Sequence, residues 1–266
     1  MSDAKVGLSG CILEIMPNNI IRKTAPNQSY SPRLRNQAEK QKIFSRFEIP
    51  NLKTPEIFQI QNNEIFSFDM EYIPGAGFLN FYKSASVADV KHTLDILSNF
   101  LDNSIKSNTI LECNVEIKKK LNSLSQASNH KDLIEILLAY CDNNPIKIPI
   151  NFCHGDLNMS NMLFKSNNIY LIDFLDSFIE SIIIDLVKLK QDLVHFWNLR
   201  VANQDVVRIR IIFAYLWSNI YERYRQYIDQ PSFKIIECVS LLRIEPYVQN
   251  TIHNQILDEI LKEIYL

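Results

Sequence analysis

Three polar residues stand at a fixed spacing in the middle of the chain. In the stretch NFCHGDLNMSNMLF, Asp156 ends a triplet that begins at His154, and Asn161 follows Asp156 after four intervening residues. Asp173 closes the strand-like run IYLIDF, which is joined to the run NMLF by a paired-asparagine turn. A hairpin of this length brings Asn161 and Asp173 to the same end. We therefore expect three oxygen-bearing side chains to converge there.

The chemistry that such a set favours is phosphoryl transfer. Mg²⁺ prefers oxygen ligands and needs only one or two protein side chains, so Asn161 and Asp173 would suffice. Asp156 would then be left to orient a hydroxyl and accept its proton, help that is typically worth about 10²–10⁴-fold. Polar residues near turns are often only turn formers. Three such residues at matching spacing favour the functional interpretation.

The spacing also matches the catalytic loop of protein kinases. The segments HGDLNMSNML and YLIDFLDS resemble the phosphotransferase family that includes aminoglycoside phosphotransferases and choline kinase. The resemblance implies an α+β, two-lobe, protein-kinase-like fold that uses ATP and Mg²⁺ to phosphorylate a small-molecule hydroxyl. By the same resemblance Asp156 would be the catalytic base, Asn161 and Asp173 would hold the metal, and His154 would brace the loop.

A kinase-like fold requires a phosphate-binding loop, a strand lysine and a helical acid near the N-terminus. The stretch GLSGC offers Gly7, Ser9 and Gly10, whose small side chains would let backbone N–H groups approach a triphosphate, although any hairpin turn can hold two glycines. Lys23, in the run IIRKTA, is the expected lysine, and Glu39 is its expected partner. The competing interpretations are an exposed strand lysine and a solvated helix face.

The stretch FSFDMEYIPG resembles the strand and hinge that hold adenine in this family, through backbone groups near Glu71 and Ile73. The segment DFLD lacks the glycine of the protein-kinase D-F-G, and the long activation segment is missing. Both departures disfavour a protein-kinase role.

Periodicity places these residues on two different parts of the chain. Residues 1–75 read as strand, strand, helix, strand, strand, with a very short first strand, and form the expected nucleotide-binding lobe. Residues 76–266 read as mainly helical, beginning with the amphipathic run VADVKHTLDILSNFL, and form the expected catalytic and acceptor-binding lobe. The hairpin that carries the polar motif interrupts this helical part.

Composition excludes several classes of protein. The 266 residues are 47% hydrophobic and 22% charged, a globular balance, and the net charge of −2 offers no basic surface for nucleic acid. Five scattered cysteines without a CxxC motif argue against a disulfide framework and a zinc site, and favour free thiols in a reducing cytosol. No signal pattern or membrane-length apolar run is present, so we expect a cytoplasmic protein with no membrane partner.

The acceptor side is less constrained. In the family an acid about a dozen residues after the metal aspartate anchors the catalytic loop, and Asp185 matches that offset. Asp176 could touch the substrate or cap a helix. Acids barely outnumber bases after Phe174, which is weak support for a polycationic aminoglycoside. An aromatic series could cage a quaternary ammonium, although core packing is the favoured interpretation; its members are Trp197, Tyr215, Trp217, Tyr221 and Tyr224.

The run DFLDSFIES…DLVKLKQD resembles phosphotransferases found with bacterial capsule or lipopolysaccharide synthesis. A sugar, polyol or related alcohol is therefore the leading acceptor, with surface-polysaccharide precursor synthesis as the context. The alternatives are an aminoglycoside or choline kinase proper, and a nucleotide-binding pseudokinase that acts as a regulatory module. A pair between Lys23 and Glu39 would favour the enzyme, and its absence would favour the pseudokinase. The acceptor and the oligomeric state stay open.

Overall fold

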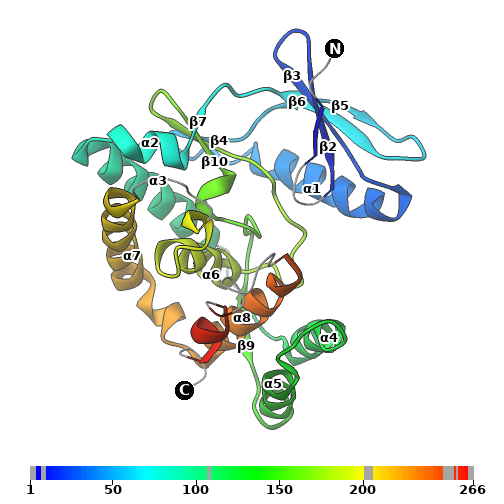
Figure 1. The fold of residues 1–266 in the computed structure, drawn as a ribbon, viewed down its shortest axis with the longest axis vertical. Coiled ribbons are helices and arrows are strands. Elements are labelled where there is room, and N and C mark those ends of the chain that lie inside the picture. Colours follow the sequence, from blue (N-terminus) through cyan, green and yellow to red (C-terminus); the bar gives the residue numbers. More distant parts are fainter. Residues whose placement is uncertain are drawn as a thin grey trace. The chain divides into compact units, whose positions relative to one another are not determined.

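The computed structural model describes residues 4–6, 10–106, 109–200, 206–247, 255 and 257–262. The chain forms two compact units, each built from two chain segments (Figure 1). Unit 1 comprises Met1–Phe100 and Met159–Asp176, and unit 2 comprises Leu101–Asn158 and Ser177–Leu266. These units differ in extent from the lobes expected at 1–75 and 76–266, because residues 76–100 and the hairpin that carries Asn161 and Asp173 both belong to unit 1. The functional division at residue 75 stays a prediction.

Unit 1 contains an antiparallel sheet of five strands in the order β1-β2-β3-β6-β5. The strands are β1 (Ala4–Val6), β2 (Ile12–Met16), β3 (Ile20–Thr24), β5 (Ile57–Gln61) and β6 (Ser67–Glu71). The turn between β2 and β3 holds Asn18 and Asn19 at φ 63° and 56°, a left-handed conformation that asparagine tolerates better than most residues. The predicted strands, the asparagine turn and the very short first strand are confirmed.

Helix α1 (Ser31–Phe44) follows the short 3₁₀ helix η1 (Gln28–Tyr30) and has the bounds that the sequence predicts. Proline is preorganised for the first turn of a helix, which explains the start at the Ser-Pro pair. The inner face of α1 contributes Leu34 and Ala38 to a core that includes Phe68 of β6 and Phe66, which directly precedes that strand. This core holds α1 against the sheet that carries Lys23.

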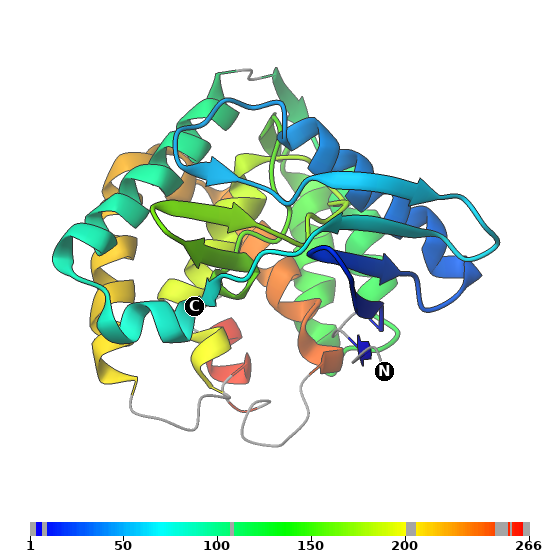
Figure 2. The ribbon, with the colours of Figure 1, turned by 90° about the horizontal axis from the view of Figure 1, so that it is seen from above.

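A second sheet in unit 1 has the order β4-β11-β10-β7. Its strands are β4 (Leu52–Lys53), β7 (Ala76–Gly77), β10 (Met162–Lys165) and β11 (Asn168–Leu171). The predicted β10–β11 hairpin is confirmed. Strand β11 also pairs with β4, in the parallel direction (Figure 2). A Cβ atom at Gly75 would lie 3.1 Å from the Cβ of Leu163, so glycine permits the close approach of this segment to β10.

Two helices complete unit 1 or lead out of it: α2 (Phe78–Ser84) and α3 (Val87–Ile105), the latter confirming the amphipathic helix predicted from the sequence. The ring of Phe81 in α2 stacks on Phe164 of β10 at a centroid distance of 3.9 Å. This contact attaches α2 to the hairpin, which thereby gains a fixed apolar support.

Unit 2 is mainly helical. It contains α4 (Asn114–Leu124), α5 (Lys131–Asn143), α6 (Ile182–Leu193), α7 (Val207–Ile228) and α8 (Pro231–Leu242), with the 3₁₀ helices η3 (Trp197–Leu199) and η4 (Glu245–Tyr247) and the paired strands β8 (Thr109–Glu112) and β9 (Lys147–Ile150). Nearly every residue of α6 is buried, as expected for a helix at the centre of a core. None of the helices in the described ranges combines the length and hydrophobicity that crossing a bilayer requires.

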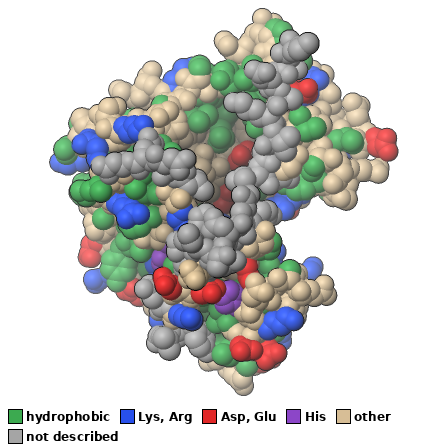
Figure 3. Space-filling model, viewed as in Figure 1, with side chains coloured by type: hydrophobic (Ala, Val, Ile, Leu, Met, Phe, Trp, Pro, Cys, Tyr) green, Lys and Arg blue, Asp and Glu red, His purple; other side chains and the backbone are tan. Residues whose placement is uncertain are grey.

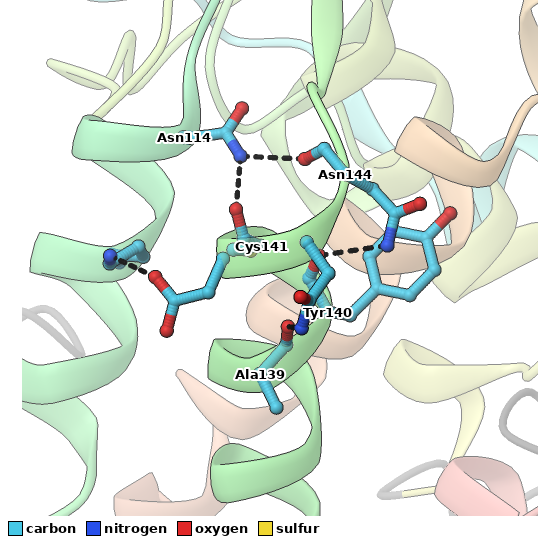
Figure 4. Close-up of polar contacts among 8 residues, drawn as sticks. Asn114, Ala139, Tyr140, Cys141 and Asn144 are labelled. Atoms are coloured by element: carbon cyan, nitrogen blue, oxygen red, sulfur yellow. Dashed lines mark hydrogen bonds and ion pairs between the residues drawn. The ribbon is translucent and has the colours of Figure 1, made fainter.

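The entry to β9 is fixed by one asparagine. The side-chain NH₂ group of Asn114 donates to the carbonyls of Cys141 and Asn144 at the end of α5 (Figure 4). The side-chain oxygen of Asn114 accepts the N–H of Ile146. The last carbonyls of a helix have no N–H donor within the helix, and the side-chain NH₂ group of Asn114 provides the donors for two of them here. The strand that leads to Asp156 therefore starts from a defined position.

All five cysteines are buried, and they form no disulfide bond with one another, which agrees with the expected free thiols. Burial, with a smaller contribution from the neighbouring Glu237 carboxylate, raises the pKa of Cys238 to about 12. A thiol that is buried and protonated reacts slowly. We expect a thiol-specific colorimetric reagent to label the folded protein negligibly within minutes, and to label all five cysteines in denaturant. Rapid labelling of the folded protein at neutral pH would contradict the structure.

Candidate active site

In unit 1 the hairpin places Asn161 and Asp173 next to each other. The 3₁₀ helix η2 (Met159–Asn161) precedes β10, and β11 ends two residues before Asp173, slightly earlier than expected. The Ile172 N–H donates to the Asn161 carbonyl at 3.0 Å, so the backbones meet at this point. Asp173 has φ 60°, a conformation kept only where its surroundings hold it. Phe174 provides such an anchor, because it is buried and its ring centroid lies 5.0 Å from that of Phe44.

Lys23 lies at the predicted metal-binding aspartate. Its Nζ is 2.7 Å from Oδ1 of Asp173 and 3.5 Å from Oε1 of Gln37. The Lys23 side chain is only 7% exposed, whereas that of Asp173 is 48% exposed. A buried ammonium requires a compensating charge, which Asp173 supplies. The structure thus joins two of the predicted site residues that are far apart in the sequence.

The predicted pair between Lys23 and Glu39 is wrong. Helical periodicity turns Leu34, Gln37 and Gln41 toward the core, whereas Glu39 lies two residues from Gln37 and is exposed. Gln37 therefore takes the position at Lys23 that Glu39 was expected to take. Helix periodicity alone could have identified Gln37, but the preference for an acidic partner concealed it.

Helix α1 also holds the segment that follows Asp173. The amide of Asn36 donates to Oδ2 of Asp176 at 2.9 Å, and Nζ of Lys40 donates to the Leu175 carbonyl at 2.7 Å. The cap of α6 is Ser181, whose side chain accepts the Ile183 N–H, so Asp176 does not cap that helix. A substrate contact by Asp176 stays a prediction.

The other predicted nucleotide-binding residues are only partly described. Gly7 and Ser9 lie outside the described residues. Gly10 has φ 79°, which suits glycine, directly before β2. Glu71 ends β6, and the buried Ile73 accepts the Gly75 N–H through its carbonyl at 2.8 Å. Roles of Gly10, Glu71 and Ile73 in binding nucleotide stay predictions.

In unit 2 the loop that carries Asp156 is tied to α6 by a buried aspartate. The two side-chain oxygens of Asp185 accept the N–H groups of His154 at 2.6 Å and Gly155 at 2.8 Å. Nδ1 of the buried His154 ring accepts the Asp156 N–H at 3.2 Å, and Gly155 has φ 87°. The expected anchoring of the loop by Asp185 is confirmed. His154 braces the loop, as the sequence predicts.

Asp156 has a charged neighbour that the sequence did not reveal. Nζ of Lys188 in α6 lies 3.3 Å from Oδ1 of Asp156, whose side chain is 23% exposed. The available signal was the spacing in DLVKLKQD, where Asp185, Lys188 and Gln191 recur every third residue on an apolar helix. The half-buried carboxylate is therefore accessible and electrostatically supported.

A family model described as the phosphotransferase enzyme family matches residues 19–227, a range that includes Lys23, Asp156, Asn161 and Asp173. The chain belongs to this family. No curated protein sequence is similar enough to this phosphotransferase to count as a relative.

Solved structures share the fold of this phosphotransferase. The streptomycin–ATP ternary complex of APH(2")-IIa is 15% identical with a TM-score of 0.60, covering 94% of this chain and 87% of the other. A putative fructosamine-3-kinase from Thermobifida fusca is 12% identical with a TM-score of 0.58, covering 97% and 91%. A glucosamine kinase bound to glucosamine, ADP and phosphate is 11% identical with a TM-score of 0.53, covering 99% and 76%. The α+β kinase-like fold is confirmed.

The donor set of the phosphotransferase fits Mg²⁺. Asn161 and Asp173 provide hard oxygen donors from adjacent backbone positions, and Mg²⁺ needs only one or two such side chains beside water and phosphate. Among the described residues, His, Cys, Asp and Glu form no cluster of three or more that could hold a metal ion, as a zinc site would. The oxygen pair is the candidate metal site.

Two members of the aromatic series make contacts other than a shared cage. Tyr224 is buried and donates to Oδ1 of Asp102 at 2.9 Å, whereas Tyr221 is exposed and donates to Asp229 at 3.0 Å. On the face shown in Figure 3, blue basic and red acidic side chains of the described residues are interspersed. Neither feature favours a polycationic or quaternary-ammonium acceptor.

The geometry separates the roles of Lys23 and Glu39. We expect Lys23→Met to weaken ATP binding by the phosphotransferase about tenfold to a hundredfold, since a hydrogen bond to a charged group contributes about 1.5–3 kcal/mol. Calorimetric titration with Mg-ATP measures the change. Glu39→Gln is the matched control, because Glu39 is exposed, and it should leave affinity within about twofold. A larger loss for Glu39→Gln than for Lys23→Met would contradict the placement.

Proposed function

We propose that this phosphotransferase transfers the γ-phosphoryl group of ATP to a hydroxyl of a sugar, polyol or related small alcohol. The observation that carries the proposal is the anchored loop before Asp156. Asp185 holds the backbone of His154 and Gly155, so the following carboxylate is preorganised. Only four residues separate Asp156 from Asn161 in the chain, and this short spacing supports the proposal that both residues take part in the same reaction.

Each residue has a defined task in the proposed reaction. Asp156 would orient the acceptor hydroxyl and take its proton as the oxygen attacks phosphorus. Lys23 would bind phosphate oxygens with its ammonium. Asn161 and Asp173 would hold Mg²⁺, which when bound neutralises charge on the phosphates. Positioning and charge compensation account for most of the rate in such reactions.

Two features support a sugar-derived acceptor. The structural neighbours include a glucosamine kinase and a putative fructosamine-3-kinase. The interspersed surface charge is not the strongly acidic field that a polycationic aminoglycoside would favour. The DFLDSFIES…DLVKLKQD run also resembles phosphotransferases found with bacterial capsule or lipopolysaccharide synthesis. We therefore propose a precursor of surface polysaccharide as the acceptor.

A panel of acceptors tests the proposal. The purified protein is incubated with Mg-ATP and sugars, polyols, amino sugars, choline or aminoglycosides, and ADP release is followed with Asp156→Asn as control. We expect acceptor-dependent release with a sugar or polyol that is lost in the variant. Release with aminoglycosides or choline alone would reassign the acceptor class.

One observation favours a second candidate, a nucleotide-binding pseudokinase. The neutral Gln37 stands at Lys23 where an acidic residue was expected. The ion pair of Lys23 with Asp173 supports the enzyme instead, because both residues are present and in contact. Tight ATP binding with no ADP release for any acceptor would favour the regulatory module.

A further inference from the structure

Lys188 carries a buried ammonium group on helix α6. The residue is 5% exposed, and its neighbours along α6 include Leu186, Val187 and Leu189, all buried. The partners of its Nζ are Oδ1 of Asp156 and Oε1 of Gln191, each at 3.3 Å. An ammonium in such surroundings is costly unless it is paired, and the only carboxylate at this distance from Lys188 within the described residues is that of Asp156.

Lys188 lies on the same side of α6 as Asp185, the residue that anchors the loop before Asp156. Asp185, Lys188 and Gln191 recur at steps of three residues, so they share one side of the helix. Asp185 holds the backbone of the loop, and Lys188 contacts the side chain of Asp156 in the same loop. This side of α6 therefore restrains both the position and the carboxylate of Asp156.

Lys190 shows what a lysine on another side of α6 does. It lies two residues further on, about 200° around the helix. Its Nζ is 2.7 Å from Oε2 of Glu237 in α8. The other carboxylate oxygen of Glu237, Oε1, lies 3.1 Å from Nε2 of His195. Lys190 thus makes a partly buried ion pair between α6 and α8, and its ion-pair partner is Glu237 rather than Asp156.

We propose that Lys188 is a positioning residue for the catalytic base, fixing the orientation of the Asp156 carboxylate and favouring its ionised form. The inference rests on the proposed role of Asp156. Other titratable groups at this loop are the His154 ring, which accepts the Asp156 N–H, and Asp185, whose carboxylate accepts backbone N–H groups. The Cys153 thiol, directly before the loop, donates to the Glu180 carboxylate at 3.3 Å. Lys188 is the cation that offsets these acidic surroundings.

The test compares Lys188→Met with the matched control Lys190→Met, which removes a partly buried ion pair made by another lysine of the same helix. We expect kcat of Lys188→Met to fall about tenfold to a hundredfold, with KM for ATP within about twofold of the wild type. The pH below which kcat/KM declines should rise, since loss of the ammonium makes Asp156 easier to protonate. Lys190→Met should keep the wild-type pH profile. An unchanged profile for Lys188→Met, or the same shift in both variants, would overturn the proposal.

A second readout does not depend on activity. The Asp156 side-chain carboxyl is followed by carbon NMR against pH in folded protein, with its signal assigned by its loss in Asp156→Asn. We expect its titration to move to higher pH in Lys188→Met and not in Lys190→Met, with both variants folded by circular dichroism. An unmoved titration overturns the positioning role even if the enzyme is active. A moved titration in a protein that phosphorylates no acceptor supports the positioning and refutes only the proposed function.

Discussion

Replacing Asp156 with asparagine is expected to lower kcat by about 10²–10⁴-fold, the usual contribution of a general base. The amide keeps the shape of the side chain but cannot accept the acceptor's proton. The loop itself should persist, because Asp185 holds it through the backbone N–H groups of His154 and Gly155. Steady-state rates of ADP release at saturating acceptor measure the loss.

Asp142→Asn is the matched control for this variant. Asp142 is an exposed acid in α5 that pairs with Lys118. In the sequence it lies outside the loop that carries Asp156. It should keep kcat within about twofold. ATP affinity should be close to wild type in both variants. If Asp156→Asn kept more than a tenth of the wild-type kcat, Asp156 would not be the base.

The second large effect is expected from Asp185→Ala. The carboxylate is fully buried and accepts two backbone N–H groups, which the alanine variant would leave without partners. Each buried donor left unsatisfied costs about 1–3 kcal/mol, so the free energy of unfolding should fall by about 2–6 kcal/mol. Urea unfolding measures this loss, and activity should disappear even at temperatures where the variant is folded.

Asp185→Asn provides a graded comparison. Its amide oxygen can still accept one of the two N–H groups, so it should lose about half as much stability as the alanine variant. Wild-type stability and activity in Asp185→Ala would show that the loop does not depend on this anchor.

Local signals predicted much of the fold. The Ser-Pro start and apolar spacing of residues 31–44 identified α1, and the paired asparagines between β2 and β3 identified their turn. The motif spacing likewise predicted that Asn161 and Asp173 would be neighbours. In each case the deciding interaction lies within a few residues or within one hairpin, where periodicity and turn chemistry act directly.

The rest depended on contacts between distant segments. Two-residue strands such as β4 and β7 carry no periodicity, and only their pairing with the β10–β11 hairpin defines them. Periodicity places Gln37 rather than Glu39 on the inner face of α1, but only the packing of α1 against the sheet shows that this face meets Lys23. Lys188 was missed because a lysine on a helix usually faces solvent, and only the tertiary packing of α6 buries it against Asp156.

The most direct test of phosphoryl transfer is phosphorus NMR of the reaction mixture with Mg-ATP and a sugar or polyol acceptor. We expect ADP and a new phosphomonoester signal from the acceptor to appear in equal amounts, to require Mg²⁺, and to be absent with Asp156→Asn. ATP bound without turnover, or ADP formed only with inorganic phosphate across the whole acceptor panel, would contradict the assignment as a small-molecule kinase.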